Sequence, residues 1–276
     1  MVGRDDRARG AVLSPPGEWE FGRPLLRLEE TTSTIDAARE WLKQGAPNGA
    51  VVIAERQTQG RGRQGRSWAA PAGGLWLTVI LRPQWDVSAA GLLGVAAAVA
   101  AAEAVGRESG VRVGLKWPND LLFQGRKLGG VLVETEVERR QIAVALVSLG
   151  LNVNFRRGEL PVEVQATATT LLEGTGREHS LPGLAARFLE ALEARLATAT
   201  DAPGALQALW GRRDALRGKQ VGVEAAGKML RGRAAGVDQE GRLLLATSLL
   251  GRIAVATGEV VSVREQGRED PQVLAE

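Results

Sequence analysis

The chain has 276 residues, more than the ~100–200 of a typical domain, so it suits one large unit or a domain with an appendage. Its 44% hydrophobic and 24% charged residues are the proportions of a folded globular protein and exclude a disordered or fibrous chain. Cysteine is absent and His179 is the one histidine, which excludes disulfides, thiolate nucleophiles and multi-histidine metal sites. The net charge is +3 and most basic residues are arginines, which favours an anionic ligand.

Residues 1–22 mix charges, prolines and glycines without periodicity, and we expect a mobile arm there. No apolar stretch typical of a signal peptide follows the first charged residues. An apolar run at 24–30 predicts a strand, and Ser33 followed by Asp36 predicts the start of a helix.

Two apolar runs, 50–54 and 75–81, predict buried strands, and we expect the long glycine-rich segment between them to be a functional loop without regular structure. The alanine-rich segment 87–105 is long enough to cross a membrane. Its small residues and Glu103 favour a buried helix instead. We therefore expect a soluble, cytoplasmic protein.

The next segments continue a mixed α/β pattern. Residues 111–117 predict a strand, and the alternation in 130–138 predicts a half-buried strand that forms a hairpin with 141–151. Leucine and phenylalanine at four-residue spacing in 184–196 predict a helix, with a second helix at 206–210.

After Arg217 the sequence changes to short β-rich runs separated by turn residues, which predicts a small barrel or sandwich. The sequence thus predicts an α+β core with a β appendage. The expected organisation is an arm at 1–22, a main domain at 23–216, a small β-domain at 217–265 and a tail at 266–276.

The segment Gly60–Arg66 contains three arginines and three glycines, which permit close approach of the backbone to an anionic ligand. A solvated basic loop and an RNA-binding segment are the alternatives. It is not a phosphate-binding P-loop, because the Gly-Lys-Ser/Thr ending is missing. No acidic residue lies between Glu55 and Asp86, so we expect this loop to be mobile until an anion orders it.

Two further motifs follow predicted strands. In the first, Lys116 and Lys127 lie on either side of the carboxylate of Asp120 in the sequence. This arrangement suits an ordinary turn, or a site that binds phosphate oxygens and positions an amine. In segment 150–154, Asn152 suits a ligand contact or a turn. His179 is expected at the surface or in a helix cap.

Together these motifs resemble those of biotin protein ligases. The resemblance covers about residues 24–264, and the co-occurrence of the motifs is more specific than any one of them. The matching segments are Ser33-Thr34 and residues 57–66, 116–120, 127–134 and 150–154.

The resemblance implies a mixed-sheet catalytic domain related to class II aminoacyl-tRNA synthetases and lipoate ligases, with a small C-terminal β-barrel. It implies that biotin and ATP, with Mg²⁺ in the ATP complex, form biotinoyl-5′-adenylate. The biotinoyl group then passes to one lysine of the biotin carboxyl carrier domain of acetyl-CoA carboxylase or a related carboxylase.

The resemblance also implies roles for individual residues. The implied catalytic residues are Lys127, Arg63, Lys116 and Asp120. The implied biotin contacts are Ser33, Thr34, Gln57, Arg61, Arg63, Lys127, Gly129 and Gly130. The implied ATP and adenylate contacts are Arg63, Arg66, Trp68, Asn119, Lys127 and Asn152, and no metal ligand is implied.

The sequence departs from the family pattern at Ile35 and Gln64, where some relatives carry Asn and Arg. Residues 1–22 are too few for the winged helix of repressor-type relatives, so we expect a monofunctional ligase that binds no specific DNA. The alternatives are a lipoate or octanoate ligase and, outside the enzymes, an RNA-binding module, although Trp68 is the one aromatic residue beside the arginines. The oligomeric state is left open, a homodimer included.

Overall fold

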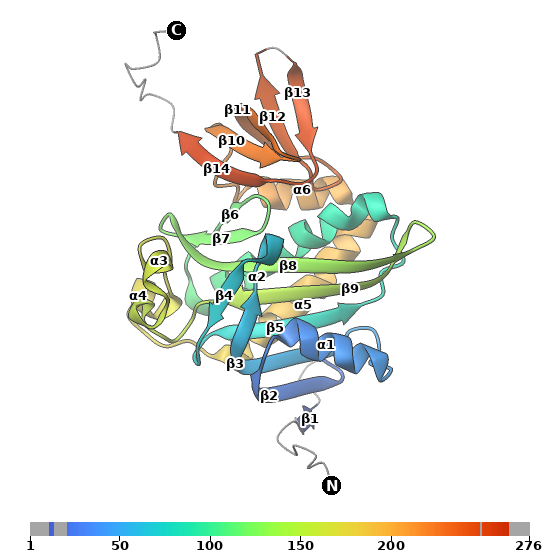
Figure 1. The fold of residues 1–276 in the computed structure, drawn as a ribbon, viewed down its shortest axis with the longest axis vertical. Coiled ribbons are helices and arrows are strands. Elements are labelled where there is room, and N and C mark those ends of the chain that lie inside the picture. Colours follow the sequence, from blue (N-terminus) through green and yellow to red (C-terminus); the bar gives the residue numbers. More distant parts are fainter. Residues whose placement is uncertain (1–10, 14–20, 249, 265–276) are drawn as a thin grey trace.

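The computed structural model describes residues 11–13, 21–248 and 250–264. Figure 1 shows a large β-sheet flanked by helices and a small β-sheet stacked beside it. Of the predicted arm, Phe21 is buried in the main core, and residues 11–13 form a strand that pairs with 25–27. The rest of the arm, 1–10 and 14–20, and the predicted tail lie outside the described residues.

Within the described ranges the large sheet contains nine strands, in the order β1-β2-β3-β5-β9-β8-β7-β6, with β4 paired to β3. Strands β2 and β3 are parallel, and the other neighbouring pairs are antiparallel. The sheet is therefore mixed, as expected for the α+β class. Its strands are β1 (Ala11–Leu13), β2 (Leu25–Thr31), β3 (Val51–Arg61), β4 (Ser67–Ala70), β5 (Leu75–Leu81), β6 (Gly114–Lys116), β7 (Asp120–Phe123), β8 (Arg126–Glu138) and β9 (Gln141–Leu151).

Helices cover both faces of this sheet (Figure 1). The side chains of successive strand residues point to opposite faces. Val52 therefore packs toward α1 on one face, while Val51 and Val79 join the core with α2 and α5 on the other. The helices are α1 (Thr34–Lys43), α2 (Ala90–Ser109), α3 (Val162–Gln165), α4 (Leu171–Thr175), α5 (Leu181–Asp201) and α6 (Pro203–Gly211).

The alanine-rich helix α2 is a core helix. Segment Val87–Ser109 has the length and apolarity of a membrane span, but residues such as Leu93, Val99 and Ala102 are fully buried. Small side chains on α2 permit its close packing against α5. The expectation of a buried helix agrees with this arrangement.

The expectation of an unstructured segment between the strands at 50–54 and 75–81 is wrong. Strand β3 continues beyond Ala54 as a polar strand and pairs with β4, so the glycine-rich residues form the turn of a hairpin. The turn uses left-handed backbone at Gln64 (φ 58°) and Gly65 (φ 74°). In β3, residues 55–59 are polar and mostly exposed, while β4 is a short Ser-Trp-Ala-Ala strand, so neither shows an apolar alternation that would predict a strand.

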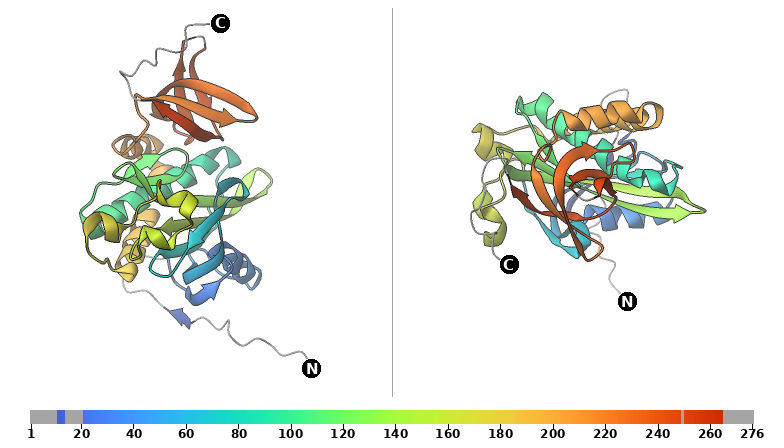
Figure 2. Two further views of the ribbon diagram at one scale, coloured as in Figure 1. Left: turned by 60° about the vertical axis from the view of Figure 1, so that its left-hand side comes forward. Right: turned by 90° about the horizontal axis from the view of Figure 1, so that it is seen from above.

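The predicted β-rich segment after Arg217 forms a five-stranded antiparallel sheet in the order β13-β12-β11-β10-β14. Figure 2 shows this sheet curling on itself when viewed from above. It packs tightly on the large-sheet domain, because a Cβ atom at Gly91 would lie 2.3 Å from the Glu240 carbonyl oxygen. The strands are β10 (Gln220–Ala225), β11 (Lys228–Val237), β12 (Leu243–Thr247), β13 (Gly251–Val255) and β14 (Glu259–Arg264).

Candidate active site

A cavity of about 250 Å³ lies among the large sheet, the β3–β4 hairpin and the first residues of β14. Every predicted site residue except Gly129 lines it. Gly129 instead allows strands β8 and β9 to approach, because a Cβ atom there would lie 2.5 Å from the Gly150 carbonyl oxygen. The roles implied by the resemblance stay predictions, but the residues themselves are gathered at one place.

One end of the cavity is formed by the start of α1 and by β3. Ser33 is the N-cap of α1, and its Oγ accepts a hydrogen bond from the Ile35 amide. The Thr34 amide and hydroxyl both donate to the side-chain oxygen of Gln57, at 2.7 and 3.2 Å. Buried neutral polar groups therefore hold this end in place.

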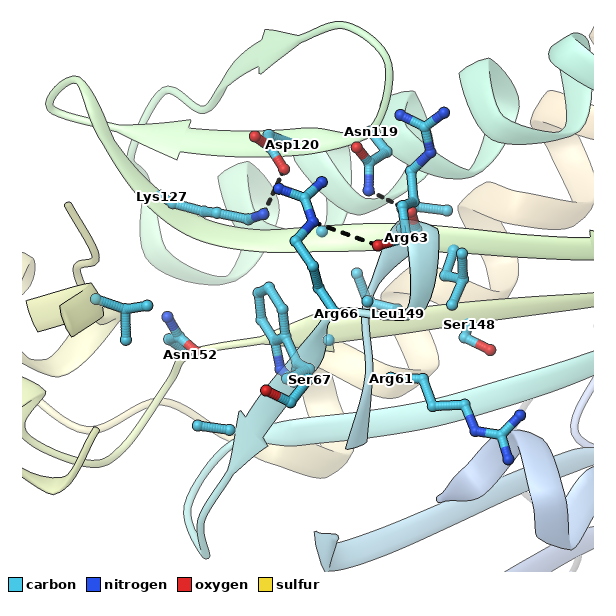
Figure 3. A pocket seen from close by; sticks show the side chains of 18 of the residues that line it. Arg61, Arg63, Arg66, Ser67, Asn119, Asp120, Lys127, Ser148, Leu149 and Asn152 are labelled. Carbon is cyan, nitrogen blue, oxygen red and sulfur yellow. Dashed lines mark hydrogen bonds and ion pairs between the residues drawn. The ribbon is translucent and has the colours of Figure 1, made fainter. Parts of the chain in front are cut away.

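The other end carries a lysine–carboxylate pair. Lys127 Nζ lies 2.6 Å from Asp120 Oδ1 and 5.1 Å from the centre of the Trp68 ring. The Lys127 side chain is 37% exposed, so its ammonium group is accessible to a ligand, while the Trp68 ring favours a cation beside it. Figure 3 shows Lys127, Asp120 and Asn152 on one side of the view, with Ser148 and Arg61 on the other.

The Lys-Trp-Pro-Asn-Asp string forms the turn of the β6–β7 hairpin, which places Lys116 opposite Asp120. Trp117 lies between them but is buried, and its indole N–H donates to the Gly241 carbonyl oxygen of the small sheet at 3.1 Å. Asn119 donates from its side-chain amide to the Val131 carbonyl oxygen, which joins the turn to β8. All five residues of this motif line the cavity, and Trp117 also makes the contact with the small sheet.

The premise that no carboxylate neutralises the arginine segment is wrong. Arg61 pairs with Asp36 of α1 at 2.7 Å, and Arg66 pairs with Glu259 of β14 at 2.6 Å. Arg63 donates to the Gly258 carbonyl oxygen at 3.0 Å. These partners are far away in the sequence, so local charge counting could not find them.

Arg63 is the most buried of these arginines. Its pKa is lowered from the ordinary value mainly by burial and further by the positive charge of Arg66, while Glu259 and Asp120 act in the opposite direction. An additional anion beside Arg63 would oppose the cost of burial. This position suits a carboxylate or phosphate oxygen.

Two buried polar atoms on the cavity wall lack hydrogen-bond partners among the described residues: the Trp68 indole N–H and the Asn152 side-chain oxygen. The Asn152 amide nitrogen is already used, since it donates to the Thr169 carbonyl oxygen at 3.0 Å. Unpaired buried donors and acceptors are costly. Two residues of the cavity wall therefore each carry a buried polar atom without a partner among the described residues.

Among the described residues, no group of three or more acidic or histidine side chains is placed to hold a metal ion. Asp120, a carboxylate on the cavity wall, is paired with Lys127. A divalent cation here would have to arrive with phosphate oxygens as ligands.

Of the two expectations for His179, a surface position is wrong, while the residue does lie at helix ends, directly before Ser180, the N-cap of α5. It is 5% exposed, and its Nε2 lies 2.8 Å from the Thr175 hydroxyl. Burial lowers its pKa from the ordinary value, and the nearby Arg177 adds to this effect. A lone histidine in a polar segment gives no pattern from which burial can be predicted.

The sequence reasoning missed several residues at the site. Glu259 lines the cavity from β14, and Ser148 lines it from β9. Thr78 lies behind Ser148 and is fully buried. Thr78 and Ser148 are single hydroxyl residues within apolar strands, and that exception to the pattern was a signal that could have found them.

Comparison with known proteins agrees with this geometry. The Biotin/lipoate A/B protein ligase family matches residues 27–154. The biotin–[acetyl-CoA-carboxylase] ligase of Mycobacterium tuberculosis is 38% identical over 230 residues, which cover 81% of this chain and 82% of that protein. The chain belongs to the biotin protein ligase family.

The family likeness extends to structure and to larger relatives. The biotin protein ligase of Aquifex aeolicus, solved in complex with biotin and ATP, has a TM-score of 0.73 and 29% identity over 87% of this chain and 98% of that one. The bifunctional ligase/repressor BirA of Bacillus spizizenii is 33% identical over 176 residues, 63% of this chain. The match spans about half the length of that relative, 54%.

Proposed function

We propose that the protein is an ATP-dependent biotin protein ligase. The observation that carries the proposal is the cavity whose one end holds Lys127, Asp120 and Arg63 and whose other end holds the buried polar groups of Thr34 and Gln57. Such a cavity suits an acid with a polar head group, with its carboxylate directed toward the cations. The Aquifex structure with biotin and ATP supports the same pair of substrates.

In the first step a biotin carboxylate oxygen forms a bond to the α-phosphorus of ATP, and the bond to the leaving pyrophosphate breaks. Lys127 and Arg63 supply positive charge where negative charge gathers on the phosphate oxygens. Mg²⁺ enters as part of the ATP substrate and is held by its phosphates. The biotin carboxylate is itself the nucleophile, so no side-chain nucleophile is needed. Holding the carboxylate and the α-phosphate in a fixed relative position contributes to the rate.

In the second step the amine of a carrier lysine forms an amide with the biotinoyl carbon, and AMP leaves with the electron pair of the broken C–O bond. The amine must lose its proton, and the Asp120 carboxylate is placed to orient it or accept that proton. We propose a carboxylase carrier domain as the acceptor, as the name of the mycobacterial relative suggests. A cytoplasmic location and the absence of specific DNA binding remain predictions, and the oligomeric state stays open.

Biotin-dependent exchange between ATP and radiolabelled pyrophosphate tests the first step with the full chain. Labelling of a purified biotin carboxyl carrier domain then tests the second. We expect both reactions with biotin. Exchange that depends on lipoate or octanoate instead of biotin would contradict the proposed substrate, and no exchange with any of the three would contradict the enzyme.

A further inference from the structure

A continuous chain of hydrogen bonds runs beneath the head-group end of the cavity. It links Ser148 of β9, Thr78 of β5, Thr34 of α1 and Gln57 of β3. The oxygen–oxygen distances are 2.8 Å for Ser148–Thr78, 2.9 Å for Thr78–Thr34 and 3.2 Å for Thr34–Gln57. We call these four residues the hydroxyl relay.

The direction of every bond in the hydroxyl relay follows from one backbone amide. The Thr34 N–H can only donate, so the Gln57 atom that lies 2.7 Å from it must be the side-chain oxygen. That oxygen can only accept, so the Thr34 hydroxyl donates to it.

The remaining protons are then assigned in turn. Each hydroxyl carries a single proton. Since the Thr34 hydroxyl donates its proton to Gln57, the Thr78 hydroxyl must donate to Thr34. Since the Thr78 proton is then in use, the Ser148 hydroxyl must donate to Thr78. The relay therefore runs in one direction, from Ser148 to Gln57.

This direction determines what the relay presents to the cavity. Ser148 lines the cavity and, with its proton committed to Thr78, has only lone pairs left to offer. Gln57 lines the same cavity, and because its side-chain oxygen accepts from Thr34, the donor that its side chain has left to offer is Nε2. The head-group end thus holds a fixed acceptor, Ser148 Oγ, and a fixed donor, Gln57 Nε2.

We propose that Ser148 is a specificity-determining contact for a cyclic urea head group and that Thr78 is the residue that positions it. This inference rests on the proposed function. A cyclic urea has N–H donors beside a C=O acceptor, which is the complement of the pair that the relay holds. The dithiolane ring of lipoate and the alkyl end of octanoate have neither group and would leave the pair unsatisfied, which is costly in a buried site.

Thr78 is suited to a positioning role because it touches no cavity space. It is 0% exposed, does not line the cavity and faces Ser148 directly across the β5–β9 ladder. Without the Thr78 oxygen, the Ser148 hydroxyl would lose its acceptor and would rotate freely. It would then present a proton as readily as a lone pair.

The first test is Ser148→Ala in the biotin-dependent exchange reaction. We expect KM for biotin to rise about tenfold, as for one lost hydrogen bond in a buried site, while KM for ATP and kcat change little. Ser262→Ala, on the small sheet away from the cavity, is the matched control and should leave all three values unchanged. An unchanged KM for biotin, or a fall in kcat alone, would overturn the proposal.

The second test compares Thr78→Val with Thr78→Ser. Both change the side chain slightly, but only serine keeps the hydroxyl group. We expect the valine variant to raise KM for biotin severalfold and the serine variant to stay close to the unchanged protein. Equal KM values for the two variants, with folding confirmed by thermal denaturation, would reject the positioning role.

The third test measures binding without turnover. In calorimetric titrations, Ser148→Ala should weaken desthiobiotin, which keeps the cyclic urea, about tenfold and leave octanoate unchanged. Equal weakening of both ligands would show a structural effect and would contradict the inference. If the protein without substitutions binds desthiobiotin but catalyses no exchange, the proposed function is contradicted. The contact between Ser148 and the head group would still be supported in that case.

Discussion

The two ends of the cavity are held together by different forces. At the head-group end, the hydroxyl relay uses neutral hydrogen bonds among side chains that are at most 8% exposed in Ser148, Thr78 and Thr34. At the hairpin end, Arg66 and Glu259 form an ion pair whose side chains are 57% and 33% exposed. We therefore expect the hydrogen bonds at the head-group end, around Ser148 and Thr34, to be insensitive to salt. We expect the exposed Arg66–Glu259 pair, which holds the β3–β4 hairpin, to be weakened by salt.

This difference matches the chemistry expected at each end. A head group must be distinguished from similar acids, and buried hydrogen bonds provide that discrimination because an unpaired partner is costly. A reactive acyl phosphate must be enclosed and later released, and exposed ion pairs permit this because their net stabilisation is small. The Arg66–Glu259 pair therefore stabilises this position of the hairpin by a small free energy, so the hairpin can still open.

The largest expected effect comes from Lys127, which pairs with Asp120 at the end of the cavity opposite Thr34 and Gln57. Lys127→Ala should reduce the rate of adenylate formation ~100-fold, because a charge on the transferring phosphate contributes mainly in the transition state. Single-turnover adenylation measures the rate, and thermal denaturation verifies folding. A folded variant with a nearly normal rate would show that Lys127 does not stabilise the transition state of adenylate formation.

A smaller effect is expected when the hairpin loses its carboxylate partner. Glu259→Gln should accelerate trypsin cleavage after Arg63 and Arg66 in the free protein by roughly two- to fivefold, the value of one exposed ion pair. Biotin with ATP should slow cleavage in both proteins. Glu224→Gln is the control, because Glu224 also lines the space beside the hairpin and its charge is not paired with Arg66 in the described residues.

Salt provides the sharpest contrast between the two ends. Raising salt from 0.05 to about 1 M should abolish the difference between Glu259→Gln and the unchanged protein, because exposed charges are screened. The same change should leave the effect of Ser148→Ala on biotin affinity in place. A trypsin difference that survives high salt would show that the hairpin is held by something other than this ion pair.

Stability should depend on pH at a site away from both ends. Burial lowers the pKa of His179, so the unfolded chain takes up a proton before the folded protein does as the pH falls. Neutral His179 therefore makes its full contribution to the free energy of unfolding above its ordinary pKa of about 6.5. This contribution should decrease as the pH falls below that value. Denaturant unfolding at pH 7.5 and 5.5 measures it, and His179→Gln should reduce the difference between the two.

The smallest expected effect is the stability of the hairpin contact itself. A double-mutant cycle of Arg66→Ala and Glu259→Gln should give a coupling free energy of ~0.2–1 kcal/mol in low salt. Coupling of several kcal/mol would mean that the hairpin is fixed and would erase the distinction between the two ends.

The fold was largely predictable where periodicity follows burial. The β-rich runs after Arg217 predict strands at 220–224, 228–237, 242–246, 252–256 and 259–263, and each observed strand begins and ends within one residue of its run. The agreement is close because turn residues separate these short segments. The β3–β4 hairpin was not predictable in the same way. In its β3 part, residues 55–59 are polar and mostly exposed, and pairing with the neighbouring strand rather than burial determines their conformation.

The residues around the site were predictable as motifs, but their partners were not. Lys127 and Asp120 lie in neighbouring motifs, so their proximity was expected. Glu259 meets Arg66 across 193 positions of the chain, and no local pattern joins them. Trp117 lies within the Lys-Trp-Pro-Asn-Asp string and lines the cavity, but no local pattern indicates that its indole also bonds to Gly241 of the small sheet.

The position of β14 has a consequence for the synthesis of the chain. The large sheet is complete once β9 has emerged from the ribosome, because β1 to β9 make up its strands in the described part of the chain. The cavity wall, however, includes Glu259 and Val260 at the start of β14. A chain that stops before β14 would lack this part of the cavity wall, and Arg66 would lack the carboxylate with which it pairs. The side of the cavity beside Arg66 is thus completed by a strand that is made after the whole large sheet.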